Sequence, residues 1–160
     1  MASWFEDGPI TELDDGHFRL ELSVNERELL RQLVPEVVGA IEAHDDRSTY
    51  RLFPPGYTED LNRQVEFDRL MRDDLQTSHI GALKVMEETA DAESLDEEQL
   101  HAWTRALNQL RLVLGTRLEI TEEEGYPDLD PEDPAAAAWE LYRYLAYLQE
   151  NAVEALSRRL

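Results

Sequence analysis

Two arginines that flank one apolar stripe are the best candidates for binding chemistry in this sequence. Apolar residues in the segment 100–121 recur at spacings of 3, 4, 3 and 4, which is typical of a buried helix face: Leu100, Trp103, Leu107, Leu110 and Leu114. At about 100° per residue, Arg111 lies near one border of this stripe and Arg117 near the other. Guanidinium groups at the edge of a core suit an anion or a protein partner. We therefore predict Arg111 and Arg117 as candidate binding residues.

The same two arginines also have a simpler, structural interpretation. A half-buried guanidinium needs carboxylates, and Glu66, Asp73 and Asp74 in the preceding helical segment could supply them. For Arg111 we expect an acidic partner from the segment 60–74.

Metal and catalytic motifs are weak or absent. Glu98 and His101 have the E-x-x-H spacing of di-iron bundles, but none of the other three histidines follows a glutamate at that spacing. A calcium loop counted from Asp128 would need Gly and Glu where the chain has Asp133 and Trp139. Neither a phosphate-binding loop nor a nucleophile elbow is found. The sequence therefore predicts no catalytic residue, metal or cofactor.

The charge balance restricts the partners of the chain. Its 160 residues include 36 acidic and 15 basic side chains, for a net charge of −21. This field disfavours nucleic acid and favours an unknown protein partner with a basic surface. The absence of cysteine excludes thiol chemistry. No segment has the pattern of a membrane span or a signal peptide, so we expect a cytoplasmic protein with no membrane role.

The secondary-structure pattern predicts a single, mainly α domain over 1–160. In residues 1–22, Phe18, Leu20 and Leu22 alternate with charged residues after a turn, which predicts a small N-terminal β-hairpin. Residues 23–160 predict a bundle of about five helices, interrupted by an acidic linker at 122–134.

Cap residues and breaks divide the bundle into its helices. Ser23, Asp96 and Asp133 predict three helix starts, with Pro134 as the first helical residue after Asp133. Pro35 should kink or divide the first helix, which ends at about residue 43. The pattern at 60–90 is longer than a typical helix, so we expect two helices that meet near residues 73 and 74. Residues 51–57, RLFPPGY, are interpreted as a turn anchored by aromatics, with a polyproline ligand as the alternative.

Two runs of the sequence resemble a known family. They are LFPPGY, from Leu52 to Tyr57, and ALNQLRLVLGTRLEI, from Ala106 to Ile120. Both are similar to an actinobacterial family of unknown function whose genes often lie near that of the Clp protease adaptor. The order of the helices also fits, and some members are described as transcriptional regulators. The resemblance implies no catalytic residues, and any thiol-based sensing proposed for relatives is excluded here because this chain has no cysteine.

Three functional hypotheses follow from these observations. The first is a non-enzymatic regulatory or protein-interaction domain. The second is a small-molecule or metal-dependent enzyme in which Arg111 and Arg117 hold an anionic substrate. The third is a transcriptional regulator that binds DNA directly, which conflicts with the charge. The oligomeric state is left open, although an intramolecular core explains the apolar stripe at 100–121 better than a dimer seam does.

Overall fold

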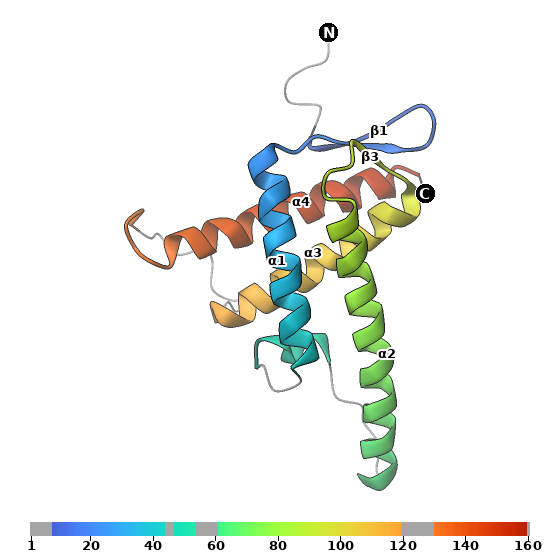
Figure 1. The fold of residues 1–160 in the computed structure, drawn as a ribbon, viewed down its shortest axis with the longest axis vertical. Helices are drawn as coiled ribbons and strands as arrows, with labels where there is room; N and C mark the ends of the chain where they lie inside the picture. The colour runs from blue at the N-terminus through green and yellow to red at the C-terminus, as the bar shows by residue number, and fades with distance from the viewer. Residues whose placement is uncertain (1–7, 44–46, 54–60, 120–129, 160) are drawn as a thin grey trace.

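Three long α-helices pack around a fourth, α3, and a small antiparallel sheet crosses one end of them (Figure 1). The computed structural model describes residues 8–43, 47–53, 61–119 and 130–159, without the side chains of 61–64, 67 and 68. The predicted fold class, mainly α with an N-terminal β-hairpin, is confirmed. In the described ranges, no helix is both long enough and apolar enough to span a bilayer.

The sheet contains the predicted hairpin and one further strand. Strands β1 (Ile10–Glu12) and β2 (Phe18–Leu20) pair antiparallel, with Ile10 opposite Leu20. Gly16 has a φ of 89° in the connecting turn, a conformation that favours glycine. Strand β3 (Ser94–Leu95) pairs antiparallel with β2, although the sequence predicted no strand after residue 22. Two residues are too few to show a period, so only pairing with β2 defines this strand.

Helix α1 (Val24–Glu42) begins and ends close to its predicted limits. The Ser23 hydroxyl accepts a hydrogen bond from the backbone N–H of Glu26 at 3.1 Å, as an N-cap does. The helix continues through Pro35, which is exposed, so this proline does not divide it. After α1, the short 3-10 helix η1 (Arg47–Leu52) contacts α3.

Helix α2 (Leu61–Glu88) is one continuous helix, so the predicted division near residues 73 and 74 is wrong. Asp73 and Asp74 are both exposed on its surface, where water solvates their carboxylates. The Thr77 hydroxyl donates to the backbone carbonyl of Asp73 at 3.0 Å, within regular helix. Neither glycine nor proline stands between residues 61 and 80 to break the helix. The fifth helix of the described chain is therefore η1 and not a second half of α2.

Helix α3 (Glu97–Arg117) is the core helix that the apolar stripe predicted. The Asp96 carboxylate accepts from the Gln99 N–H at 2.7 Å, and the Gln99 side chain accepts from the Asp96 N–H at 2.9 Å. Trp103 is fully buried, and its indole N–H donates to the Thr89 hydroxyl at 2.7 Å. A Cβ at Gly115 would lie 3.2 Å from the Tyr142 ring, so glycine permits the close approach of α4.

Helix α4 (Ala136–Ser157) begins two residues later than predicted and packs along α3. The Asp133 carboxylate accepts from the N–H of Ala135 at 2.9 Å, in a turn just before the helix. Its capping group therefore stabilises the entry to α4 without being the N-cap itself. Most of the predicted turn at 51–57 and of the acidic linker at 122–134 lies outside the described residues.

Candidate functional site

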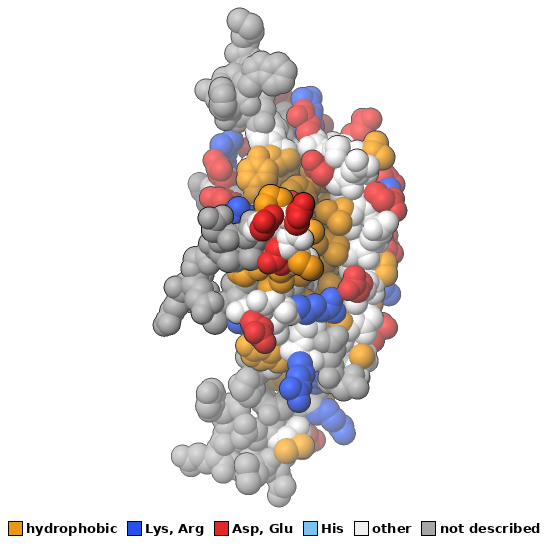
Figure 2. All heavy atoms as spheres, turned by 90° about the vertical axis from the view of Figure 1, so that its left-hand side faces the viewer, with side chains coloured by type: hydrophobic (Ala, Val, Ile, Leu, Met, Phe, Trp, Pro, Cys, Tyr) orange, Lys and Arg blue, Asp and Glu red, His pale blue; other side chains and the backbone are white. Residues whose placement is uncertain are grey.

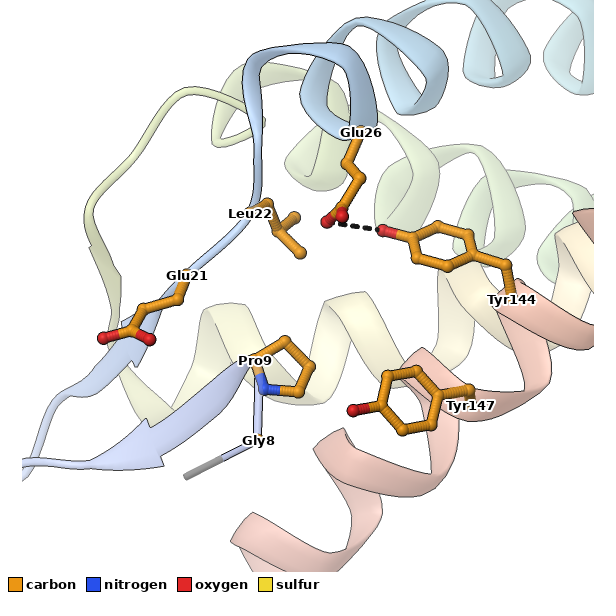
Figure 3. A pocket seen from close by; sticks show the side chains of 7 residues that line it. All are labelled: Gly8, Pro9, Glu21, Leu22, Glu26, Tyr144 and Tyr147. Carbon is orange, nitrogen blue, oxygen red and sulfur yellow. Dashed lines mark hydrogen bonds between the residues drawn. The ribbon is translucent and has the colours of Figure 1, made fainter. Parts of the chain in front are cut away.

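A pocket of about 240 Å³ lies where the hairpin meets α1 and α4 (Figure 3). Three separate parts of the chain form its wall. The lining residues are Gly8, Pro9, Glu21, Leu22, Glu26, Tyr144 and Tyr147. The pocket is therefore a product of the tertiary fold, because Tyr144 and Tyr147 are more than 100 positions from the other lining residues in the sequence.

A hydrogen bond across the pocket joins α1 to α4. The Tyr144 hydroxyl donates to Oε2 of Glu26 at 3.1 Å, and Figure 3 shows the two side chains pointing toward one another. Glu26 is the residue that a capping box would fold back onto Ser23, but its carboxylate reaches α4 instead. Burial, followed by the nearby charge of Glu26 and their hydrogen bond, raises the pKa of Tyr144 above its ordinary value of 10. The phenol therefore remains a donor at neutral pH.

The chemistry of the pocket suits a cation with an apolar stem. Leu22 and Pro9 supply apolar surface, and Tyr147, which is 52% exposed, presents a ring. Glu26 adds a negative charge inside the pocket, and Glu21 adds one at its outer edge, where Figure 3 shows its side chain pointing away from the tyrosines. No arginine, lysine or histidine is among the seven lining residues. Carboxylates and aromatic rings without a base are complementary to ammonium and guanidinium groups.

Arg27 holds the segment before α1 in place beside this pocket. Its guanidinium donates to the carbonyls of Leu20 at 2.9 Å and Leu22 at 3.1 Å, and to those of Ala90 at 2.9 Å and Ala92 at 2.7 Å. These carbonyls belong to the end of β2, to the segment between β2 and α1, and to the connection after α2. One side chain therefore satisfies four backbone acceptors from two distant segments.

Arg159 performs a similar role at the end of α4. It donates to Glu12 and to Glu97, each at 3.0 Å, and to the carbonyl of Gly16. Its guanidinium carbon also lies 4.2 Å from the centre of the Phe18 ring. The end of α4 is thereby tied to both strands of the hairpin and to the start of α3.

The two arginines predicted from the sequence point to different neighbours. Arg111 donates to the side-chain amide oxygen of Gln149 and lies 5.5 Å from the centre of the Tyr142 ring, both on α4. Arg117 donates to Glu36 of α1 at 2.9 Å. Among the described residues, the hydrogen-bond partner of Arg111 is thus a neutral amide, and not the carboxylate expected from 60–74. The predicted acidic partner of Arg111 is therefore wrong, because α4 and not the segment 60–74 supplies the acceptor. The binding role of both arginines stays a prediction.

The E-x-x-H pair lies on the exposed face of α3. Glu97, Glu98, His101 and Arg105 line a shallow depression there, and Nε2 of His101 lies 3.9 Å from Glu97. In the described part of the chain, no group of three or more His, Asp or Glu side chains is arranged to hold a metal ion.

The sequence did not predict the pocket. It also did not predict that Arg27 and Arg159 each join distant segments of the chain. The sequence pattern singles out neither Tyr144 nor Glu26 as a functional residue. One signal was present, because Ser23 and Glu26 fit a capping box and Tyr144 lies beside the apolar stripe of its own helix. Nothing in the spacing showed that the two would meet.

Comparison with known proteins places the chain in a family. It belongs to the family described as "Domain of unknown function (DUF2017)", whose sequence profile matches residues 8–156. It is also similar to the protein named "Oxidative stress regulator AosR" from Mycobacterium bovis and from Mycobacterium tuberculosis. Each is 25% identical over 180 aligned positions, which cover 88% of this chain and 82% of the relative. No solved structure matches the chain. The family resemblance seen in the sequence is therefore confirmed.

Proposed function

We propose that this chain is a cytoplasmic, non-enzymatic regulatory protein that acts by contact with a protein partner. Its similarity to a protein named as a regulator supports the regulatory part of the proposal. The observation that carries the choice of partner is the net charge of −21, which is complementary to a basic protein surface and repels nucleic acid.

The distribution of charge supports the same choice. Figure 2 shows a group of acidic side chains over the hydrophobic area in the middle of one face, with basic side chains gathered in the lower half of that face. Carboxylates next to apolar surface suit a partner in which basic side chains surround an apolar contact. A basic partner would also meet the negative charge of Glu26 at the pocket that this residue lines together with the two tyrosines.

The name of the relative refers to oxidative stress, but a response based on cysteine oxidation is not possible for this chain. The sequence contains no cysteine, so oxidation of a thiol cannot be the event that this protein senses. Under our proposal, regulation depends on the binding and release of the partner.

Affinity capture tests the proposal. The tagged chain would be used to retain proteins from a lysate of its natural host at about 0.05 M and about 0.5 M salt, where screening lengths differ severalfold. We expect a specific protein with a basic surface to bind at low salt and to be reduced at high salt. An unrelated acidic protein of equal net charge is the matched control, because it retains whatever binds negative charge alone. If both baits retain the same proteins, the proposal fails.

A nuclease-treated sample separates the DNA-binding hypothesis from this one. If nuclease treatment removes the partner, and the untreated sample contains genomic DNA fragments, direct DNA binding replaces our proposal. We expect retention to be unaffected by the nuclease.

A further inference from the structure

We propose that the pocket between the hairpin, α1 and α4 binds an arginine side chain of the protein partner. This inference rests on the proposed function and names the place and the group through which the partner is recognised. Four features of the pocket support the inference: its size, its apolar wall, its carboxylates and its aromatic ring.

The size of the pocket fits one side chain. At about 240 Å³, it is smaller than the cavities of roughly 300–1,000 Å³ that hold drug-sized ligands and cofactors. Its wall also combines two surfaces that a long basic side chain can use at once. The methylene stem can lie on Leu22 and Pro9, while the charged end remains among polar groups.

The Glu26 carboxylate has an oxygen available for the cation. Its Oε2 accepts from Tyr144, and among the described residues Tyr144 is its hydrogen-bond partner. A carboxylate can accept from several donors, so Oε1 can receive an N–H from a guanidinium without losing Tyr144. The hydrogen bond to Tyr144 also fixes the direction of the carboxylate before the ligand arrives, which lowers the entropic cost of binding.

The aromatic ring favours arginine over other cations. Tyr147 is half-exposed and lines the pocket beside Pro9, so part of its aromatic surface is accessible to a planar group. A guanidinium can stack on such a ring and donate to a carboxylate at the same time, whereas an ammonium makes only a point contact. Glu21 adds a second negative charge at the outer edge. The N-terminus of α1 contributes about half a positive charge, which the two carboxylates outweigh. Arg27 adds a positive charge beside the pocket, but it is not a lining residue and its guanidinium is directed at four backbone carbonyls.

Other occupants fit less well. An anion would meet two carboxylates and no basic side chain in the lining. A neutral apolar group would cover Glu26 without replacing its water, which is unfavourable for a charged carboxylate.

Titration with a small probe followed by two-dimensional amide NMR tests the inference without the partner. The probe is N-acetyl-arginine methylamide, and its neutral isostere N-acetyl-citrulline methylamide is the control ligand. We expect saturable shifts at the amides of Glu21, Glu26, Tyr144 and Tyr147, with half-saturation at about 1 mM for so small a ligand. Citrulline should give no saturable shift, and the lysine derivative should bind more weakly than arginine. Arginine shifts spread evenly over the acidic surface would overturn the inference.

Matched variants assign the binding to particular side chains. Glu26→Gln removes the charge but keeps an acceptor for Tyr144, and we expect it to weaken arginine binding about tenfold. Glu150→Gln makes the same charge change at an exposed position of α4 and should leave the affinity unchanged. Tyr147→Ala should weaken binding about threefold, and Tyr50→Ala, which removes another exposed tyrosine, should not. Equal affinities of Glu26→Gln and Glu150→Gln would contradict the assignment, provided that both variants give native amide spectra.

The capture experiment separates failure of this inference from failure of the proposed function. If the wild-type chain retains a partner and the Glu26→Gln bait retains the same amount, the partner does not use the pocket although the proposed function stands. If the pocket binds arginine but no partner is retained, the proposed function fails. Self-association that the arginine probe reverses would show that a second copy, and not a different protein, supplies the arginine.

Discussion

The two halves of α2 belong to one regular helix but lie in different surroundings. In the C-terminal half, Leu83 and Met86 are fully buried against the rest of the bundle. In the N-terminal half, Val65 and Leu70 are 69% and 55% exposed, and Figure 1 shows this half extending away from α3 and α4. The apolar spacing is similar in both halves, so the spacing predicts the helix without predicting which part is covered. Burial depends on the helices that lie opposite.

Truncation of leucine in each half of α2 gives the largest expected contrast. Leu83→Ala should lower the free energy of unfolding by about 3 kcal/mol, because it removes fully buried methyl groups and leaves a cavity. Leu70→Ala makes the same change at an exposed position and should stay within about 0.5 kcal/mol. Urea melts of the two variants measure the difference, and similar midpoints would show that the two halves are covered alike.

Arg27 and Arg19 give a similar contrast between a partly buried and an exposed position, at the end of the bundle where the sheet lies. Arg27→Ala leaves four backbone carbonyls without their donors and should lower the free energy of unfolding by about 2.5 kcal/mol. Arg27→Lys should recover only part of this loss, because an ammonium has three donors and no planar fork. Arg19→Ala, at a side chain that is 56% exposed, is the control and should have an effect below about 0.5 kcal/mol. A loss for Arg27→Ala no greater than the control would show that water satisfies those carbonyls.

Arg111, which contacts α4, should have an intermediate effect on the free energy of unfolding. Because its partners are the neutral amide of Gln149 and the Tyr142 ring, Arg111→Ala should cost about 1.5 kcal/mol, less than the loss of a buried ion pair. Arg105→Ala on the exposed face of α3 should stay within about 0.5 kcal/mol. Arg111→Lys should not restore full stability. If denaturant melts give equal midpoints for Arg111→Ala and Arg105→Ala, Arg111 is not structural, and a ligand-binding role becomes the better explanation.

The smallest expected effect concerns the pH dependence of the Tyr144 hydrogen bond. Because the pKa of Tyr144 is raised in the folded state, the folded phenol keeps its proton above pH 10, where the unfolded phenol loses it. This contribution to stability is therefore complete below pH 10 and declines as the pH rises further. At pH of about 10.5 the wild-type chain should have lost about 0.5 kcal/mol more than Tyr144→Phe, after allowance for solvent screening at this half-buried position. Parallel melts at pH of about 8 and 10.5 measure the difference, and equal losses would contradict the raised pKa.

The candidate residues show where sequence reasoning was sufficient. Arg111 and Arg117 were placed at the two borders of a buried stripe, and in the structure they reach α4 and α1 on either side of α3. Their positions follow from helix geometry alone. The partners could not be predicted, because a partner depends on which helix lies opposite and at what height. For the same reason an amide of α4 was not foreseen as the partner of Arg111.

Local patterns determined the elements of this protein. The β-hairpin follows from alternation around a turn, and the starts of α1 and α3 follow from Ser23 and Asp96, whose side chains bond the backbone within three residues. The net charge, and with it the kind of partner that we propose, also follows from the sequence alone. Each of these properties depends on neighbouring residues or on composition, so no knowledge of the fold is required.

Only the tertiary structure decided how distant residues meet. Strand β3 exists because β2 lies beside it, and the pocket exists because Glu26 and Tyr144 approach from opposite ends of the chain. Arg27 satisfies carbonyls more than 60 positions away. Such contacts leave no periodic signal, since a hydrogen bond of about 3 Å can join any two residues that packing brings together. The acidic composition thus indicates that a cation is favoured, and the packing of the hairpin against α1 and α4 determines where one can bind.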